Sequence, residues 1–310
     1  MRIVYWGSSK ISTEVAVHLL ANNFNIILFI TQPDRQKGRG KKFLPTPVKL
    51  LAKERNIPFL TPGDIDRDDV IKKISDYNPE IFFLCAYAKI LGKKLLELPE
   101  KGAVNLHFSL LPQLRGAAPI ARAIMEGFKT TGVTTFFMNE SLDRGSIILQ
   151  KETAIKEFET AGELEKRLTE LGKNAAKETI RAIEQGNYKT ITQNNTKKSY
   201  AKKILKEERL IDWKRPAIDI VRRINGLSPK PGSFSFLRGK RVIFLKAKTG
   251  NSGSGEPGTI ISEKKLEVIA EDNKTVIIEL LKPEGKKSIS GKDFINGFRI
   301  KEGDFFQTHQ

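Results

Sequence analysis

The sequence contains little cysteine and little histidine, and both shortages exclude whole classes of site. Cys85 is the only cysteine among 310 residues, so an intramolecular disulfide or a cysteine-based zinc centre is excluded. There are three histidines, His18, His107 and His309, which are too few and too widely spaced for a histidine-rich metal site. We therefore expect a functional site without a metal.

Long hydrophobic runs are also missing. No apolar run approaches the roughly 20 residues that a membrane-spanning helix needs. Residues 1–7 predict a strand and a turn, without the charged region and small-residue cleavage site of a signal peptide. We expect a cytoplasmic protein with no membrane contact. We also expect a monomer, because no exposed apolar helix face stands out.

Acidic residues are in the minority: 36 Asp and Glu face 54 Lys and Arg, which gives a net charge of +18. Such an excess favours a polyanionic partner through electrostatic steering and counterion release. A general preference for lysine on solvated surfaces would give the same total, so the distribution matters. Basic residues gather at 35–42, 197–203 and 286–292, and this clustering favours a nucleic acid.

The first part of the chain, up to about residue 185, alternates short apolar runs with amphipathic stretches, which predicts an α/β fold with a doubly wound, mostly parallel sheet. Strands are expected at 2–6, 25–31, 57–60, 81–86, 103–107, 132–138 and 146–153. Helices are expected at 13–20, 47–55, 70–77 and 93–98, followed by a long helix from Thr160 to about Gln185. The spacing of Thr160 and Glu163 matches a capping box.

The composition changes after this point. Residues 186–206 are rich in Asn, Thr, Lys and Ser with little apolar content, which predicts a linker. An amphipathic helix around 220–224 then precedes short strands of a small closed barrel, expected at 233–237, 241–246, 258–262, 266–270 and 276–281, with a Gly/Ser loop at 249–258. We predict a first domain at 1–186, a basic linker at 187–207 and a second domain at 208–310.

Two phosphate-binding motifs can be rejected. After the first strand, Gly7 is a single glycine where a dinucleotide fingerprint needs three. The segment 38–42 lacks the glycine spacing of a Walker motif and the Ser or Thr after its lysine. As a basic loop it could still grip a phosphate backbone. A disordered, solvated loop is the alternative.

Polar side chains gather where the strand 103–107 ends. Asn105 and His107 are two residues apart, so they share one face at the sheet edge where ligands bind. Asp143 lies in a turn from which it can approach the same edge. An amide, a neutral imidazole and a carboxylate suit attack of a nucleophile on a carbonyl, with Asn105 and His107 stabilising the oxyanion. A structural histidine and a triad with Ser109 are the alternatives, although no Gly-x-Ser-x-Gly elbow is present.

The run Asn105-Leu-His107-x-Ser109-Leu-Leu-Pro112, together with Asp143, resembles the active-site signature of the 10-formyltetrahydrofolate-dependent formyltransferases. Further matches cover nearly the whole chain in the same order and resemble the members of that family that act on methionyl-tRNA. They are Thr31–Arg35, Gly38–Lys42, Pro45–Lys49, Arg115–Ile120, Ser199–Lys203, Lys206–Glu208, Ile211–Trp213, Gly255–Ile260 and Pro283–Lys287.

The resemblance implies transfer of a formyl group from 10-formyltetrahydrofolate to the α-amino group of initiator methionyl-tRNA, without a metal. It implies a Rossmann-like formyltransferase domain followed by an OB-like β-barrel, and it makes Asn105, His107 and Asp143 catalytic. The implied folate-binding residues are Ser109, Leu110, Leu111, Pro112, Cys85, Tyr87 and Ile90. The implied tRNA-binding residues are Arg35, Lys37, Arg39, Lys41, Lys42, Lys203, Lys286 and Lys287.

Phe108, Arg144, Ser146 and the turn 7–9 depart from the usual family pattern, but none of these departures removes a catalytic group. Two other functions are compatible with parts of the sequence. A formyltransferase for a small amine, such as a sugar nucleotide or glycinamide ribonucleotide, would share the polar core but would not need the basic segments. A folate- or RNA-binding protein without catalysis would not need all three polar residues.

Overall fold

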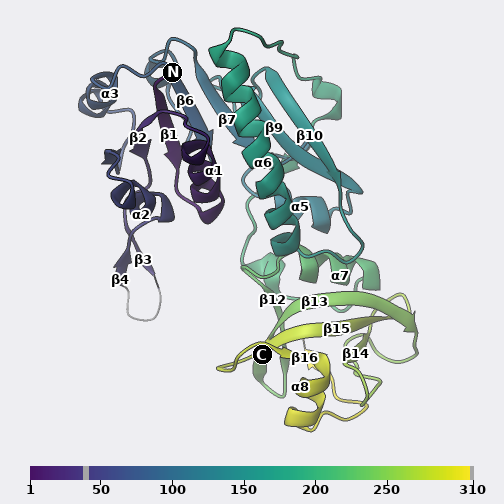
Figure 1. Cartoon of the computed structure of the whole chain (residues 1–310). Helices are drawn as coiled ribbons and strands as arrows, with labels where there is room; N and C mark the ends of the chain where they lie inside the picture. Colours follow the sequence, from purple (N-terminus) through teal and green to yellow (C-terminus); the bar gives the residue numbers. More distant parts are fainter. Residues whose placement is uncertain (38–41, 308–310) are drawn as a thin grey trace. The chain divides into compact units, whose positions relative to one another are not determined.

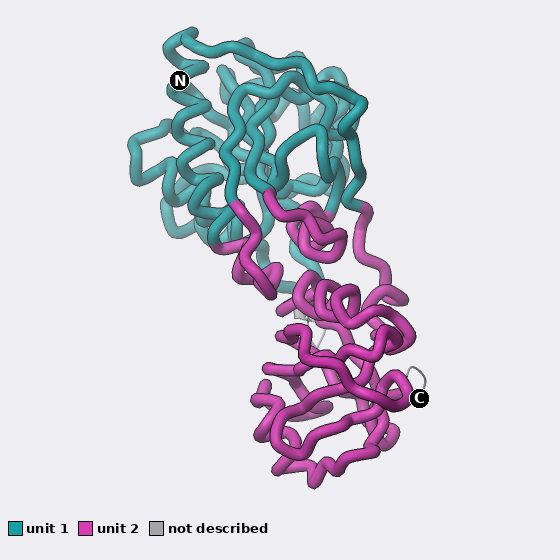
Figure 2. The backbone as a smooth tube through the Cα atoms, turned by 90° about the vertical axis from the view of Figure 1, so that its right-hand side faces the viewer, with its two compact units in different colours: residues 1–117, 131–153, 167–201 teal, residues 118–130, 154–166, 202–310 magenta. Residues whose placement is uncertain are grey.

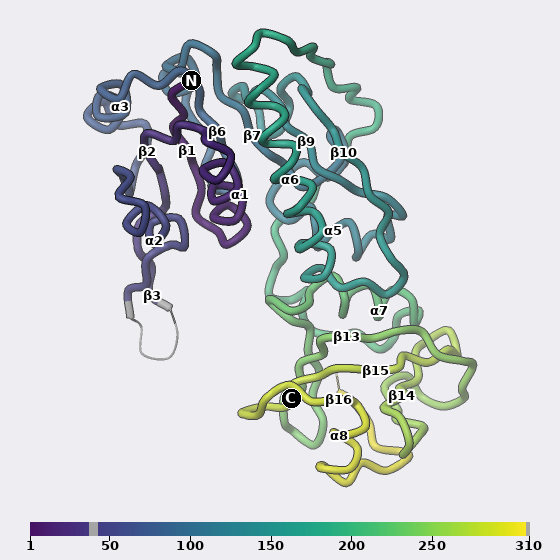
Figure 3. The backbone as a smooth tube through the Cα atoms, viewed as in Figure 1, coloured from purple at the N-terminus to yellow at the C-terminus, as the bar shows by residue number. Residues whose placement is uncertain are grey.

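The structure is a computed structural model that describes residues 1–37 and 42–307. It divides into two compact units, coloured separately in Figure 2. The first unit comprises residues 1–117, 131–153 and 167–201, and the second comprises 118–130, 154–166 and 202–310. The chain therefore passes between the units several times, where the colour changes in Figure 2. Figures 1 and 3 follow the same chain from the N-terminus in purple to the C-terminus in yellow.

A seven-stranded sheet with the order β10-β9-β7-β6-β1-β2-β5 forms the centre of the first unit. Its strands are β1 (Ile3–Gly7), β2 (Ile26–Ile30), β5 (Phe59–Leu60), β6 (Ile81–Cys85), β7 (Ala103–His107), β9 (Thr130–Phe137) and β10 (Ile147–Ala154). The first five strands are all parallel to one another, and β9 is antiparallel to its neighbour β7. The predicted α/β fold with a mostly parallel sheet is confirmed. Every residue of β1 and β6 is buried, as expected for parallel strands covered on both faces.

The order of the strands places the candidate site. From β1 the chain continues to β2 and β5 on one side, and β6 and β7 lie on the other side. The switch point of this doubly wound sheet therefore lies between β1 and β6, where ligands bind beyond the carboxyl ends of the strands. Strand β7 ends at His107, on this same edge.

Helices and turns lie between these strands. The helices are α1 (Lys10–Ala21), α2 (Pro47–Glu54), α3 (Asp68–Ser75) and α4 (Lys93–Leu96), and α6 (Ala161–Glu184) follows the last strand, β10. The capping box of α6 is confirmed: the N–H of Thr160 donates to the Glu163 carboxylate at 2.8 Å, and the N–H of Glu163 donates to the Thr160 hydroxyl at 3.3 Å. Strands β3 (Arg35–Lys37) and β4 (Lys42–Leu44) pair antiparallel and hold the described residues of the first basic cluster.

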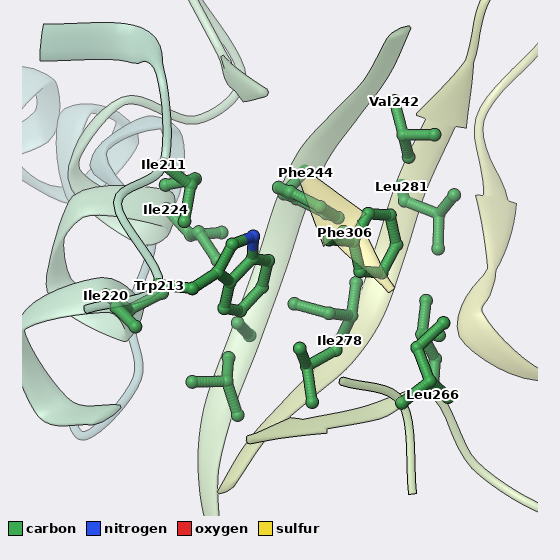
Figure 4. Close-up of a cluster of buried hydrophobic side chains, with 14 of the residues drawn as sticks. Ile211, Trp213, Ile220, Ile224, Val242, Phe244, Leu266, Ile278, Leu281 and Phe306 are labelled. Carbon is green, nitrogen blue, oxygen red and sulfur yellow. The ribbon is translucent and has the colours of Figure 1, made fainter. Parts of the chain in front are cut away.

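The second unit contains a six-stranded antiparallel sheet. Its strands are β12 (Ser233–Leu237), β13 (Lys240–Ser252), β14 (Glu267–Ile269), β15 (Lys274–Pro283), β16 (Ile289–Ser290) and β17 (Phe306–Gln307). Its helices are α5 (Pro119–Met125), α7 (Ala217–Gly226), α8 (Gly291–Phe298) and the short η2 (Glu207–Arg209). In its core, shown in Figure 4, the Trp213 ring stacks on Phe306 and meets Phe244 edge-on, both at 5.7 Å.

Two expectations for the second unit need correction. The loop predicted at 249–258 begins later, because β13 continues to Ser252 and pairs there with Lys274 of β15. At 258–262 the chain forms only isolated bridges at Thr259 and Ile260 instead of a strand. No helix of the described ranges combines the length and hydrophobicity needed to cross a bilayer.

Candidate active site

The His107 ring is held by a main-chain oxygen and faces a carboxylate. Its side chain is 7% exposed, and Nε2 lies 2.9 Å from the carbonyl oxygen of Leu114. Because a carbonyl oxygen can only accept, Nε2 carries a hydrogen and donates it. The other nitrogen, Nδ1, lies 3.8 Å from Oδ2 of Asp143. The orientation of the ring is therefore set by Leu114, with Nδ1 toward the carboxylate.

The triad hypothesis for Ser109 is wrong. Its hydroxyl is fully buried and donates a 2.6 Å hydrogen bond to the carbonyl oxygen of Gln113. Both ring nitrogens of His107 face other groups, so the histidine cannot take a proton from this serine.

Asp143 is fixed at both its carboxylate and its main chain. Oδ2 accepts a 2.8 Å hydrogen bond from the backbone N–H of Gly116. The main-chain oxygen accepts from Nε2 of Gln193 at 2.9 Å. Its φ of 51° lies in the left-handed region, which non-glycine residues seldom adopt. The structure therefore brings Asp143 to His107, as the sequence predicts.

Asn105 lies two residues before His107 on β7, so the two side chains share a face of the sheet. The residue is half-buried, and its side-chain amide forms no hydrogen bond to any residue in the described ranges. Asn105 thus has an amide available to a substrate beside the His107 and Asp143 pair.

The loop from Ser109 to Pro112 is tied to the strands beside it. The Thr134 hydroxyl donates to the carbonyl oxygen of Ser109 at 2.6 Å and accepts from the N–H of Leu111 at 3.1 Å. Gln150 of β10 donates to the carbonyl oxygen of Leu111 at 2.9 Å. Ser109 and Leu111 are buried, whereas Leu110 and Pro112 are half-buried. The backbone of this loop is therefore rigidly placed beside His107.

Buried and exposed side chains alternate at residues 85–88, where β6 ends. Cys85 is fully buried, and burial raises the pKa of its thiol to about 12. Tyr87 is also buried against Trp6, whereas Ile90 is 57% exposed. Contacts from Cys85 to a ligand would have to come from its backbone, while Ile90 can offer its side chain.

The predicted tRNA-binding residues lie on different parts of the surface. Arg35, Lys203, Lys286 and Lys287 are exposed, the last two in the turn between β15 and β16. Lys37 and Lys42 lie in β3 and β4. Arg39 and Lys41 lie outside the described residues.

Residues 187–201 take part in the site, although their composition predicts a linker. They contain η1 (Asn195–Lys197) and β11 (Tyr200–Ala201), which pairs in parallel with β8 (Arg115–Gly116). Sequence reasoning missed the contributions of Gln193, Leu114 and the N–H of Gly116. The Arg115–Ile120 match was the only signal near them. In residues 1–37 and 42–307, no group of three His, Cys, Asp or Glu side chains is placed to hold a metal ion.

Comparisons with known proteins identify the family of the chain. A family model described as "Formyl transferase" matches residues 1–180, and one described as "Formyl transferase, C-terminal domain" matches 203–299. The methionyl-tRNA formyltransferase of Thermotoga neapolitana is 38% identical over 304 residues, which cover 98% of this chain and 97% of the relative. That of Carboxydothermus hydrogenoformans is 37% identical and covers 99% of this chain and 100% of the relative.

Solved structures share the fold at much lower identity. WlaRD, a sugar 3N-formyl transferase solved in the presence of dTDP and 5-N-formyl-THF, has a TM-score of 0.68 at 19% identity, covering 93% of this chain and 99% of its own. HypX from Aquifex aeolicus, in complex with tetrahydrofolic acid, has a TM-score of 0.65 at 17% identity, covering 99% of this chain and 50% of its own. The first family model spans more than half of the chain, and the two relatives match nearly all of it. The chain therefore belongs to the formyl transferase family, among the methionyl-tRNA formyltransferases.

Proposed function

We propose that this protein transfers the formyl group of 10-formyltetrahydrofolate to the α-amino group of initiator methionyl-tRNA. The single observation that carries the proposal is the placement of Asn105, His107 and Asp143 together at one sheet edge, with the imidazole 3.8 Å from the carboxylate. Nearly full-length similarity to methionyl-tRNA formyltransferases supports the choice of acceptor. The folate ligands of the fold relatives support the choice of donor.

In the proposed reaction, the amine nitrogen attacks the formyl carbon and negative charge develops on the formyl oxygen. The Asn105 amide donates a hydrogen bond to that oxygen. Because Nε2 of His107 is committed to Leu114, the ring can donate from Nδ1 only when it carries a second proton. The Asp143 carboxylate stabilises that imidazolium. In this proposal an imidazolium takes the place of the neutral imidazole that the residue types alone suggest, because a charged donor stabilises an oxyanion more strongly.

The proton balance also involves Asp143. A free α-amine has a pKa of about 8, and the adjoining ester lowers it, so much of the amine is neutral at pH 7. After attack, the new C–N bond leaves a positively charged nitrogen. Asp143, directly or through water, takes its proton. The tetrahedral oxyanion then re-forms the carbonyl while the bond from the formyl carbon to the folate nitrogen breaks. That nitrogen takes the proton held by Asp143, which restores the carboxylate as tetrahydrofolate leaves.

In this proposal the folate lies against the rigid loop 109–112 and the segment 85–90. Residues Ser109, Leu110, Leu111 and Pro112 line one side, and Cys85, Tyr87 and Ile90 line the other. The fixed backbone of the first loop supports this assignment, because its polar groups would need no rearrangement when the ligand binds.

The basic surface is proposed to bind the tRNA. Residues 187–207 contain six lysines and one acidic residue, and all six lysines are exposed. None of the six forms an ion pair with a carboxylate of the described residues, so their charge is available to phosphates. We propose a formyltransferase domain at 1–186, a basic linker at 187–207 and an OB-like tRNA-binding domain at 208–310. The antiparallel sheet of the second unit supports the last assignment.

The proposal is tested by incubating the protein with 10-formyltetrahydrofolate and methionyl-tRNA and measuring formylmethionine after deacylation. Uncharged tRNA and free methionine serve as controls. We expect product from methionyl-tRNA alone. Formylation of free methionine at an equal rate would exclude a tRNA substrate. Turnover of an amino-sugar nucleotide or glycinamide ribonucleotide, without turnover of methionyl-tRNA, would favour the small-amine alternative.

A further inference from the structure

We propose that Gln193 is a positioning residue for Asp143 and that Arg115 holds Gln193 in the orientation this task requires. The inference rests on the proposed function, since it assigns a role to the catalytic carboxylate. It concerns side chains that approach the Asp143 turn from two distant parts of the chain, one of which has the composition of a linker.

Gln193 bridges the turn that carries Asp143. The residue is 6% exposed, although its neighbours in sequence are exposed. Its Nε2 donates to the main-chain oxygen of Asp143 at 2.9 Å and to that of Gly145 at 2.8 Å. Both amide hydrogens are therefore used, and they fix the two ends of this three-residue turn relative to one another.

The turn needs such support because its backbone is unusual. Asp143 has a left-handed φ of 51°. A Cβ at Gly145 would collide with the carbonyl oxygen of Phe137, so the chain passes very close to β9 at that point. A non-glycine residue in the left-handed region persists only where its surroundings stabilise it. The two hydrogen bonds from Gln193 supply that stabilisation.

Arg115 determines which end of the Gln193 amide faces the turn. The residue is 1% exposed, and its Nε and Nη2 donate to Oε1 of Gln193 at 3.1 and 2.6 Å. Nη2 also donates to Oδ1 of Asn195 at 3.1 Å. With Oε1 facing a cation that can only donate, the NH₂ group must face the turn.

The ligands of this buried cation are neutral. Among the described residues, no carboxylate forms an ion pair with Arg115. A glutamate at 193 would satisfy the guanidinium well. It would then present an oxygen in place of NH₂ to the carbonyl oxygens of Asp143 and Gly145. The site therefore requires an amide, which both accepts and donates.

Both the carboxylate and the main chain of Asp143 are therefore held by the dipeptide Arg115–Gly116. Gly116 holds Oδ2 through its N–H, and the adjacent Arg115 holds the turn through Gln193. If the Gln193 link is lost, the turn is free to shift and the distance between Asp143 and His107 is no longer fixed. A displacement of about 1 Å can reduce a rate by about 100-fold.

The test compares Gln193→Glu with Gln185→Glu, an exposed glutamine at the end of α6 that undergoes the same change in charge. We expect Gln193→Glu to lower kcat by about 10- to 100-fold while KM for both substrates changes less than about threefold. Gln185→Glu should match the wild type. Gln193→Met provides a second variant if the glutamate variant does not fold. It removes both the oxygen that accepts from Arg115 and the NH₂ group that donates to the turn.

A double-mutant cycle separates positioning from a general structural role. If Gln193 acts through Asp143, adding Gln193→Glu to an Asp143→Asn variant should lower kcat by less than about twofold further. The same fold loss in both backgrounds would overturn the proposal, and so would a wild-type kcat for Gln193→Glu and Gln193→Met. A wild type that does not formylate methionyl-tRNA would instead refute the proposed function, which keeps the two failures distinct.

Discussion

The backbone N–H of Gly116 donates a 2.8 Å hydrogen bond to Oδ2 of Asp143. The donor belongs to β8, which is held in place by parallel pairing with β11. Gly116 has a φ of 117°, and a Cβ added to it would lie 2.9 Å from the carbonyl oxygen of Ala201. The close pairing that places this N–H therefore depends on the absence of a side chain.

We expect Gly116→Ala to lower both stability and kcat. The added methyl group would push β8 from β11, at a cost of about 1–3 kcal/mol in the free energy of unfolding, and would move the donor away from Asp143. Gly239→Ala is the control, because its φ is 72° but no atom lies within 4 Å of an added Cβ. It should show a smaller loss of stability in urea and an unchanged kcat. Equal losses of kcat in both variants would contradict a specific role for Gly116.

Replacing either oxyanion donor should slow the reaction. Asn105→Ala and His107→Ala are each expected to lower kcat by about 10²–10³, equivalent to about 3–4 kcal/mol, because each removes one donor to the developing charge. Folate affinity, measured by fluorescence titration, should change little. Either variant with nearly full turnover would show that the residue is not catalytic.

The sequence predicts the catalytic residues because their signal is local. The strand 103–107 is apolar except at Asn105 and His107, and the observed β7 has the same bounds. Asp143 lies in the turn after β9, a strand that runs antiparallel to β7 and ends beside Val104, near the amino end of β7. Side-chain type and strand period are sufficient to bring Asn105 and His107 together, but the approach of Asp143 to His107 depends on the path of this turn.

The supporting groups could not be predicted in this way. Leu114 and Gly116 act through a backbone carbonyl and an N–H, which every such residue carries. Gln193 is 78 residues from Arg115 in the chain, and its neighbours have the polar composition of a linker. Tertiary contacts bury Gln193, and no hydrophobic periodicity in residues 187–201 indicates this burial.

The basic cluster at 35–42 should affect the tRNA substrate selectively. We expect Arg39→Ala to raise KM for methionyl-tRNA several-fold and to leave KM for 10-formyltetrahydrofolate unchanged, because the loop offers charge to phosphates. The effect should diminish as salt rises. Lys101→Ala removes the same charge next to the amino end of β7 and serves as the control. Equal changes in both KM values for Arg39→Ala would refute a tRNA-specific role.

The second unit should lose stability in acid through Glu208. The Arg122 guanidinium donates to its two carboxylate oxygens at 2.6 and 2.9 Å and thereby lowers the pKa of Glu208. A lowered pKa stabilises the fold above the unfolded-state value of about 4.3, and this contribution is lost as pH falls through the folded-state pKa. Glu208→Gln should therefore flatten the decline of unfolding free energy between pH 6 and about 3. The exposed Glu302→Gln should decline like the wild type, and parallel curves for Glu208→Gln would contradict the assignment.

Cys85 should make the first unit sensitive to alkali. Burial raises the pKa of its thiol from 9.0 to about 12. Because the raised pKa favours the neutral thiol in the folded state, its stabilising contribution is complete below pH 9 and is lost as the pH rises from there toward 12. The loss should be about 1.4 kcal/mol per pH unit within this window. Urea unfolding at pH 8, 9 and 10 should show a steeper decline for the wild type than for Cys85→Ala, by about 1.4 kcal/mol at pH 10. The alanine variant lacks the thiol but keeps every other group that titrates in alkali. Parallel curves of unfolding free energy against pH for the two proteins would mean that the thiol ionises with similar ease in the folded and unfolded chains.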